Sequence, residues 1–467
     1  MTTSTVKANY GDESPIAAFA TTPGNSALTL IRCSGKESID LASSVFSKST
    51  PPLAAAPGNT VIHGWIVNGE KIDDVLVSVF RSPKSYTGED SLDICCHGGA
   101  AAGKAVMAAL KNAGFRDALP GEFTFRAFMN GKLDLTKAES VMEIVSAKTE
   151  TSRRHAVSRL SGSLYEEIDG IKKLLTDVLA AAEIYLDYSE DEISADAEEA
   201  EGRLPKKDIA LSVLERLKKL SDSWRIERVY QEGITLVIAG CPNSGKSSLF
   251  NALLKEDRSI VTEIPGTTRD WIEAWVSVEG IPIRLIDTAG LRKTDDSVEK
   301  IGVERSRKIL EESDIVLYLI DGAQGLTEED KIFNSQNGKS IFVWNKCDIA
   351  LPPESLQISG QAPICVSAKT GEGLPGLYSA ITSQAGIKDL QQTETSTAAL
   401  GTARQKTLVD AAIASLQEAL SLSDKNEPLD IIAPLIKDAV NSLGEITGEV
   451  SASDLLEKMF SNFCVGK

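Results

Sequence analysis

Residues 240–247 read Gly-Cys-Pro-Asn-Ser-Gly-Lys-Ser, and this stretch decides the class of fold to which the chain belongs. The apolar run 234–239 before it predicts a buried strand, and residues 248–254 after it predict a helix. A strand, a glycine-rich loop and a helix form the setting of a phosphate-binding loop, because backbone N–H groups and the helix N-terminus attract a polyphosphate. In such a loop Lys246 reaches the outer phosphates and the Ser247 hydroxyl binds magnesium. The stretch therefore indicates a nucleotide hydrolase.

Three further motifs follow in the order of a guanine-nucleotide-binding domain, each after a predicted strand: residues 287–290, 345–348 and 367–369. Asp348, in the second motif, is able to accept hydrogen bonds from the ring N–H and the exocyclic amine of guanine. Adenine has the opposite polarity at this edge and would leave the carboxylate unpaired. The third motif, Ser-Ala-Lys, is expected to contact the guanine carbonyl. The four motifs together predict a GTP-binding α/β domain with a mostly parallel sheet.

The catalytic part of this domain lacks a side chain that could polarise the attacking water. We expect Asp287 to bind magnesium through water and the N–H of Gly290 to contact the γ-phosphate. Thr268, in the segment Gly-Thr-Thr-Arg-Asp at 266–270, completes the magnesium shell only when a γ-phosphate is present, and so acts as a switch. The next residue after Gly290 is Leu291, which cannot polarise water, whereas many small GTPases place glutamine there. The transition-state charge must therefore be met by another group.

Asn243 offers one source of that charge. Its side chain, with carbonyl groups of the loop 262–267, is suited to a monovalent cation, and potassium there would replace an arginine finger electrostatically. A side chain that only stabilises the loop fits the same spacing equally well, so both roles stay open. A carboxylate that orients water is available in the segment 295–299, although solvation alone also explains those acidic residues.

Bulk properties limit the remaining possibilities. A chain of 467 residues is too long for one core and predicts about two to four domains. The net charge of −18 and the pI of about 4.8 repel nucleic acid at long range, so any nucleic-acid site must be a local patch. The seven cysteines have no metal-binding spacing, as in reduced proteins of the cytosol. Without a long apolar run or a signal-peptide core, we expect a soluble, cytoplasmic protein.

Composition shifts divide the chain. Short apolar runs separated by glycine and proline predict a mixed α/β domain first, with a helix over 105–111. Thr136 and Glu139 then form a capping box, and long helical periodicity follows through residue 188. Another helix covers 206–224. Helical patterning returns after the GTPase segment. Because each helical part alone would leave an apolar face uncovered, we expect one all-α domain with the GTPase inserted into it. The predicted domains are 1–130, 131–230, 231–387 and 388–467.

The chain ends in Phe-Cys-Val-Gly-Lys, residues 463–467. Ser453 is expected to cap a helix whose apolar stripe belongs to a core. That stripe consists of Leu455, Leu456, Met459, Phe460 and Phe463. Cys464 then follows an anchored helix, and two interpretations of it stay open. It is a nucleophile or general acid/base if a positive neighbour lowers its pKa, or it is a small buried residue.

These features resemble the MnmE (TrmE) family of tRNA modification GTPases over essentially the whole chain. Short sequences outside the GTPase motifs contribute to the resemblance; they lie at 87–90, 97–99, 120–123, 132–135, 445–449 and 464–467. The resemblance implies potassium-activated GTP hydrolysis with Mg²⁺ and a homodimer formed by the N-terminal domain. It also implies a flavin-dependent partner of the MnmG (GidA) family, in a heterotetramer. Together they install an aminomethyl or carboxymethylaminomethyl group at C5 of the wobble uridine of certain tRNAs. The one-carbon unit comes from a reduced folate, 5-formyl- or methylene-tetrahydrofolate, bound to the N-terminal domain.

The resemblance also implies roles for individual residues. Potassium ligands are Asn243, Thr262, Ile264 and Thr267, and magnesium ligands are Ser247 and Thr268. Catalytic candidates are Lys246, Arg269, Glu299, which orients water indirectly, and Cys464, which acts on the tRNA. Folate contacts are Arg32, Asp93, Lys132 and Lys467. The GTP-contacting set is Asn243, Ser244, Gly245, Lys246, Ser247, Ser248, Thr262, Glu263, Ile264, Pro265, Gly266, Thr267, Thr268, Asp287, Thr288, Ala289, Gly290, Asn345, Lys346, Asp348, Ser367, Ala368 and Lys369.

Two residues depart from the family pattern. Asp93 stands where relatives have glutamate, so its carboxylate has a shorter reach toward a folate. Pro265 stands where a small residue is usual, and proline restricts its own φ and the residue before it. An alternative function is a GTPase switch in ribosome or RNA assembly without chemistry on the RNA. Such proteins often add a basic RNA-binding module, and no dense Lys/Arg segment follows the GTPase part here.

Overall fold

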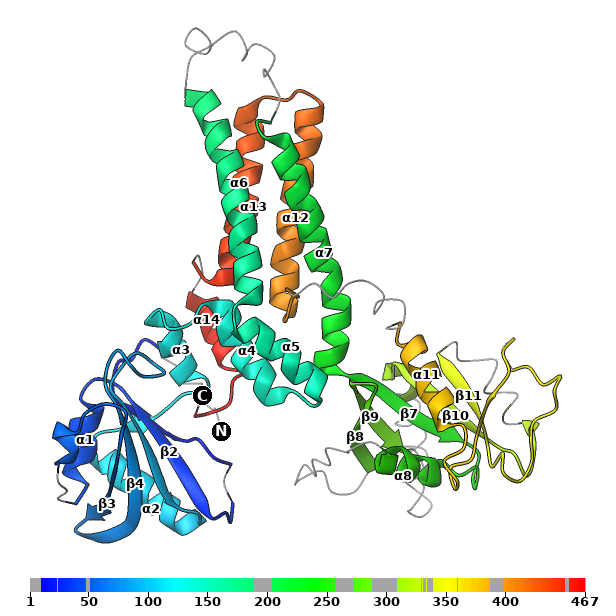
Figure 1. The fold of residues 1–467 in the computed structure, drawn as a ribbon, viewed down its shortest axis with the longest axis horizontal. Helices are drawn as coiled ribbons and strands as arrows, with labels where there is room; N and C mark the ends of the chain where they lie inside the picture. Colours follow the sequence, from blue (N-terminus) through cyan, green and yellow to red (C-terminus); the bar gives the residue numbers. More distant parts are fainter. Residues whose placement is uncertain are drawn as a thin grey trace, which may run out of the picture. The chain divides into compact units, whose positions relative to one another are not determined.

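The chain forms two compact units in this computed structural model (Figure 1). Unit 1 comprises Met1–Met142, Tyr165–Val213 and Ala411–Lys467, and unit 2 comprises Glu143–Leu164 and Leu214–Asp410. The structure describes residues 10–22, 24–47, 51–187, 204–256, 272–287, 309–328, 330, 333, 339–358, 360–386, 398–449 and 453–466. Each unit contains one six-stranded sheet. Among the described residues, no helix combines the length and the apolar character needed to span a membrane.

The sheet of unit 1 has the strand order β3-β4-β5-β2-β1-β6, and all its neighbours are antiparallel except β1 and β6. Its strands are β1 (Ile16–Phe19), β2 (Leu28–Ser34), β3 (Thr60–Asn68), β4 (Glu70–Phe80), β5 (Ser91–His97) and β6 (Arg116–Asp117). The helices of this part are α1 (Ser38–Ser44), the 3-10 helix η1 (Leu53–Ala55), α2 (Ala100–Ala113) and α3 (Glu122–Met129). The predicted mixed α/β domain is therefore confirmed, and the helix expected over 105–111 is α2.

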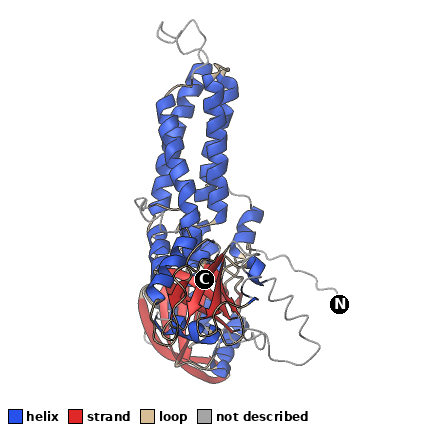
Figure 2. Ribbon diagram, turned by 90° about the vertical axis from the view of Figure 1, so that its right-hand side faces the viewer, coloured by secondary structure: helices blue, strands red, loops and turns tan. Residues whose placement is uncertain are grey.

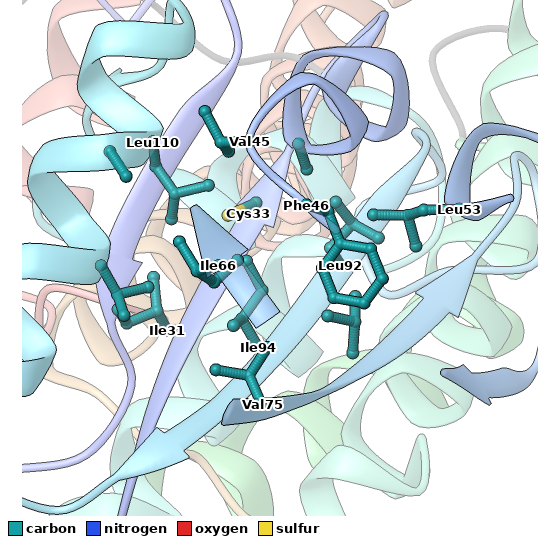
Figure 3. Packing of buried hydrophobic residues seen from close by; sticks show 14 of the residues in the cluster. Ile31, Cys33, Val45, Phe46, Leu53, Ile66, Val75, Leu92, Ile94 and Leu110 are labelled. Carbon is teal, nitrogen blue, oxygen red and sulfur yellow. The ribbon is translucent and has the colours of Figure 1, made fainter. Parts of the chain in front are cut away.

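One face of this sheet is covered by α2 and the segment around α1 (Figure 3). Leu110 of α2 packs in the same buried cluster as Ile31 of β2 and Ile94 of β5. Alternate residues of each strand point into the cluster, as the period of two in a β-strand requires. Gly114 ends α2 with a φ of 117°, a left-handed conformation that glycine adopts without strain. The sheet thus has a packed face and a second face that is available for a site.

The helical periodicity predicted after residue 136 is confirmed as far as Asp187. The structure divides it among three helices: α4 (Leu135–Ser146), α5 (Glu150–Leu160) and α6 (Ser163–Asp187). Thr149 starts α5 by accepting a hydrogen bond from the Ser152 N–H, and Gly162, with a φ of 108°, follows its end. A capping side chain and a positive-φ glycine therefore interrupt an otherwise continuous apolar periodicity.

Four more helices of the all-α part lie among the described residues: α7 (Lys207–Glu232), α12 (Ala403–Asp424), α13 (Leu429–Thr447) and α14 (Ser453–Phe460). In unit 1, α6 and α13 run side by side with the start of α7, up to Val213, and the end of α12, from Ala411 (Figures 1 and 2). The helix predicted over 206–224 is α7, which continues to Glu232 because its last turns pack on the core of unit 2 through Ile226, Val229 and Tyr230.

The sheet of unit 2 has the order β12-β11-β10-β7-β9-β8 and is parallel except for the antiparallel pair β8–β9. Its strands are β7 (Ile234–Gly240), β8 (Ile272–Val278), β9 (Ile281–Asp287), β10 (Ile315–Asp321), β11 (Ser340–Asn345) and β12 (Ile364–Val366). Every residue of β10 is buried, because clusters of apolar side chains cover both faces of the sheet. The helices α8 (Lys246–Glu256) and α11 (Leu374–Gln384) lie on one face. Ligands of such sheets bind at the carboxyl ends of the strands.

Candidate nucleotide site and N-terminal cavity

The loop between β7 and α8 has a backbone that only glycine permits at two points. Gly240 has a φ of 140°, and a Cβ there would collide with the carbonyl of Leu319 on β10. Gly245 has a φ of 94°, and a Cβ there would collide with the side-chain amide of Asn345. Asn243, with a φ of 65°, is also left-handed, a conformation that asparagine tolerates better than most residues. The loop is therefore shaped as the phosphate-binding stretch requires.

Side chains of the neighbouring strand ends fasten this loop. The Asn345 side-chain amide donates to the Ser244 carbonyl at 2.7 Å, and Lys346 Nζ donates to the Asn243 carbonyl at 3.1 Å and to Asp321 at 2.6 Å. Lys246 Nζ donates to the carbonyl of Gly240 at 3.0 Å. Residues predicted from separate motifs thus meet at the carboxyl ends of the strands.

Two predicted magnesium-site residues also meet. The Ser247 hydroxyl donates to the Asp287 carboxylate at 3.0 Å, although forty sequence positions separate them. Asp287 is buried at the end of β9. A hydroxyl and a carboxylate are the oxygen ligands that Mg²⁺ prefers, so the pair fits that ion chemically.

The expected guanine contacts lie after β11 and β12. The N–H of Ala368 donates to the Asn345 side-chain carbonyl at 3.1 Å, and the buried Ser367 hydroxyl accepts from the Thr370 N–H at 3.2 Å. These bonds join the two loops into one rim. The Asp348 side chain on this rim is exposed. The carboxylate is therefore accessible to a base.

A buried polar cluster beside the loop was missed by the sequence analysis. Asp330 accepts hydrogen bonds from the hydroxyls of Tyr318, at 2.9 Å, and Thr327, at 2.7 Å, and from Cys241 Sγ at 3.3 Å. Burial and the neighbouring Asp330 carboxylate raise the pKa of Tyr318. The cluster attaches the start of the phosphate loop to the segment after β10. Its sequence signal is the spacing Thr-x-x-Asp, which caps a helix.

Thirteen of the predicted site residues lie outside the described residues, and their roles stay predictions. They are Thr262, Glu263, Ile264, Pro265, Gly266, Thr267, Thr268, Arg269, Thr288, Ala289, Gly290, Glu299 and Lys467.

The N-terminal domain contains a small cavity on the sheet face opposite α2. It has a volume of about 150 Å³, and its lining includes Arg32 of β2, Asp93 of β5 and Tyr86. Arg32 Nε donates to the Asp93 carboxylate at 3.0 Å, and the guanidinium lies 5.9 Å from the centre of the Tyr86 ring. Two of the predicted folate contacts therefore share one cavity. A third, Lys132, is exposed, and its Nζ donates to the Pro83 carbonyl at 2.9 Å.

The C-terminal tail reaches this cavity. The Gly466 carbonyl lies 3.4 Å from the Arg32 guanidinium, and a Cβ on Gly466, at a φ of 94°, would lie 2.5 Å from the Phe19 carbonyl. The predicted core stripe is confirmed where it is described, since Leu456, Phe460 and Phe463 are buried. These anchors hold Cys464, which is exposed and whose carbonyl accepts from the Gly121 N–H. The interpretation of Cys464 as a small buried residue is therefore wrong.

The parallel sheet, the glycine-dependent loop after β7 and the Asn-Lys-Cys-Asp rim after β11 define a guanine-nucleotide-binding P-loop domain, joined to an α/β domain and a set of long helices. Two family descriptions match: "GTP-binding protein TrmE N-terminus" over residues 15–132 and "MnmE helical domain" over residues 135–464. The chain belongs to the MnmE (TrmE) family, as its motifs suggested, and the predicted α/β multidomain class is confirmed.

Relatives with the same description match from end to end. The "tRNA modification GTPase MnmE" of Treponema denticola is 45% identical and covers 99% of both chains. That of Borreliella afzelii is 41% identical over 97% of this chain and 98% of its own. Among solved structures, the G domain of the T. maritima FeoB iron transporter is 29% identical with a TM-score of 0.26, covering 32% of this chain and 98% of that one.

Proposed function

We propose that this protein is a potassium-activated GTP hydrolase that takes part in modifying the wobble uridine of certain tRNAs. With a flavin-dependent partner of the MnmG family, it would install an aminomethyl or carboxymethylaminomethyl group at C5, using a one-carbon unit from a reduced folate. One observation carries this proposal: a single chain has both a guanine-nucleotide loop and a separate arginine–aspartate cavity that its own C-terminal tail approaches. A simple nucleotide switch has no use for the second feature.

The nucleotide loop supplies the first half of the proposal. Lys246 binds the outer phosphates, Asp348 pairs with guanine, and Ser247 with Thr268 holds Mg²⁺, which neutralises phosphate charge when bound. Asn243 is the proposed potassium ligand, with Thr262, Ile264 and Thr267. Its side chain is exposed on the loop, and its amide oxygen is a suitable donor for an alkali ion. Because Leu291 offers no polar group, this cation provides the charge that the chain lacks, while Glu299 orients water indirectly and Arg269 assists.

The N-terminal cavity supplies the second half. A pterin ring presents an N–H and an amino group side by side, and a carboxylate such as Asp93 accepts from both. Arg32 Nε donates to this carboxylate at 3.0 Å, and its guanidinium lies 5.9 Å from the centre of the Tyr86 ring, which gives the site a flat, aromatic wall. The volume of about 150 Å³ suits one end of a folate rather than the whole molecule. Lys132 and Lys467 would contact the remainder, and the exposed Cys464 would act on the tRNA base.

The proposed function includes an oligomeric state and a set of domain boundaries. We infer a homodimer formed through the N-terminal domain, a heterotetramer with the flavin-dependent partner, and a cytoplasmic location. The proposed domains are an N-terminal folate-binding domain at 1–130, a helical domain at 131–230 and 388–467, and the GTPase domain inserted at 231–387. This division gives the two helical parts one shared core.

Mass analysis of wobble uridines in a deletion strain tests the proposed modification. Loss of the modified nucleoside, restored by the parent gene, supports it, whereas unchanged tRNA would instead favour a GTPase switch in ribosome or RNA assembly. The chemistry of hydrolysis has its own test. Sodium in place of potassium should leave GTP affinity nearly unchanged while turnover falls, and Glu299→Ala should bind GTP normally but hydrolyse it slowly. Equal turnover in both salts would remove the cation from the mechanism.

A further inference from the structure

The indole ring of Trp275, on the edge strand β8, is in contact with a lysine side chain. Lys148, in the short link between α4 and α5, places its Nζ 3.2 Å from the centre of the Trp275 indole. A cation close to an aromatic face is attracted by the ring quadrupole, and the attraction is stronger where water is partly excluded. Burial lowers the pKa of Lys148, and the nearby Arg284 lowers it further while Glu273 opposes them. Both members of the contact belong to unit 2.

The same indole touches the turn that leads into β7. Gly233, with a φ of 78°, separates α7 from β7, and a Cβ there would lie 2.7 Å from Trp275 Cζ3 and 2.6 Å from the Pro282 carbonyl. Any larger residue at this turn would displace the indole or the strand. Trp275 is therefore in contact with Lys148 and with the first residues before the strand that ends in the phosphate loop.

A second contact joins α5 to the β8–β9 hairpin. Gly280 forms the hairpin turn with a φ of 85°, and a Cβ there would lie 2.5 Å from the Thr151 hydroxyl. One residue further along α5, the Ser152 hydroxyl donates to the carbonyl of Tyr230 at the end of α7. The first turn of α5 thus touches the hairpin turn and the end of α7 together.

The hairpin is directly connected to the nucleotide site. β9 ends at Asp287, which accepts from the Ser247 hydroxyl, and β8 begins immediately after the segment that contains Thr268 in the sequence. A strand of seven residues is about 20 Å long and transmits a displacement along its axis because it is hydrogen-bonded on both sides. The α5 end of the hairpin and the Asp287 carboxylate therefore lie on the same hydrogen-bonded pair of strands.

We propose that Lys148 and Trp275 are positioning residues for GTP hydrolysis: their contact fixes the β8–β9 hairpin against α5, and so fixes Asp287 relative to the phosphate loop. The inference rests on the proposed GTPase activity. It means that the segment 143–164 controls the rate of hydrolysis without touching the nucleotide. An event that moves α5 would change turnover, and by linkage the bound nucleotide would change the position of α5.

Steady-state GTP hydrolysis by the full-length chain in potassium tests the proposal. Lys148→Met keeps the aliphatic stem but removes the charge, and kcat should fall about three- to tenfold with KM for GTP changed less than about twofold. Trp275→Leu should give the same pattern. Lys148→Arg keeps a cation and should restore most of kcat, and Trp275→Phe should restore part of it. Lys71→Met is the matched control, because Lys71 lies 4.4 Å from the centre of the Trp65 ring in unit 1, whereas the GTPase sheet belongs to unit 2.

Several results would overturn the inference. If Lys148→Met and Trp275→Leu keep kcat within about twofold of the parent, the contact does not position the site. If kcat falls only in variants whose midpoint of thermal unfolding also falls, and Lys148→Arg does not restore kcat, the contact contributes to stability alone. An equal loss in Lys71→Met would point to a general effect of removing a surface charge. A parent protein that binds GTP without hydrolysing it would overturn the proposed function as well, whereas active parent and active variants would overturn only the positioning role.

Discussion

Replacing Arg159 by methionine should destabilise unit 2 by about 3–5 kcal/mol, the range measured when one partner of a buried ion pair is removed. The Arg159 side chain is only 2% exposed and lies between two buried carboxylates. Its Nε donates to Glu143 at 2.7 Å and its Nη1 donates to Glu227 at 2.8 Å. Two hydrogen bonds to charged groups, each contributing roughly 1.5–3 kcal/mol, give a similar total. Gly401 packs against both Glu143 and Arg159, and a Cβ there would lie 2.1 Å from Glu143 Oε1 and 2.7 Å from Arg159 Nε.

The pH dependence of this effect follows from the ionisation of Glu227. Burial alone would raise the pKa of Glu227, but its hydrogen bond from His155 and the charge of Arg159 outweigh burial and lower it. In the parent, the stability from this carboxylate is present above its unfolded pKa and is lost as the pH falls through the folded pKa. Without Arg159, burial dominates and the folded pKa rises. Acid then neutralises the carboxyl in the folded variant, so the stability difference between variant and parent should shrink as the pH is lowered from 7 to 5.

Urea unfolding, monitored through hydrogen exchange of the amides in α5 and α7, measures the difference in the free energy of unfolding. Arg153→Met is the matched control, since Arg153 lies on the same helix and also pairs with a glutamate, Glu150, but both side chains are exposed. The control should leave the free energy of unfolding nearly unchanged, because exposed pairs contribute little. If the two variants unfold at the same urea concentration, the buried pairs do not stabilise the unit and the reasoning is wrong.

Gly245→Ala should reduce GTP binding by at least about tenfold in a fluorescent-nucleotide titration, because a Cβ at this positive φ would collide with the Asn345 amide; unchanged affinity would show that the loop relaxes freely. Asp348→Asn should weaken guanine selectivity by about 100-fold or more and raise xanthine affinity, measured by competition; a loss without that gain would contradict the pairing. Native thiol labelling should have a fast phase that Cys464→Ser abolishes, since Cys464 is exposed whereas burial raises the pKa of Cys96 to about 11 and keeps it unreactive. A fast phase in the serine variant would mean that another cysteine is accessible.

The parts of the nucleotide site that lie in short local segments were the ones best predicted from the sequence. The loop before α8 and the motifs after β9 and β11 each follow one buried strand, and carboxyl ends of parallel strands meet at one edge. The approach of Ser247 to Asp287 could therefore be expected. The breaks between α4, α5 and α6 could not, because apolar periodicity continues through them and only Thr149 and Gly162 mark the ends. Exposure of Cys464 was likewise beyond the sequence, since it depends on which side of an anchored helix the tail leaves.

Among the interactions that no sequence pattern predicted, those of α5 lie where the chain enters and leaves the GTPase sheet. The GTPase sheet is reached along the chain through the end of α7 and left through the segment before α12. At the first connection, α5 contacts Tyr230 through Ser152 and Glu227 through Arg159. At the second, Gly401 packs against Arg159. One helix thus holds both connections and, through Lys148 beside it, the hairpin that ends in the nucleotide site. The buried charges of Arg159 fix α5 strongly, whereas the contact of Lys148 with the hairpin is weaker and more exposed. This difference in strength fits the proposed positioning role. If the contacts of Arg159 broke before that of Lys148, α5 would move without displacing the hairpin, and no change would reach the nucleotide site.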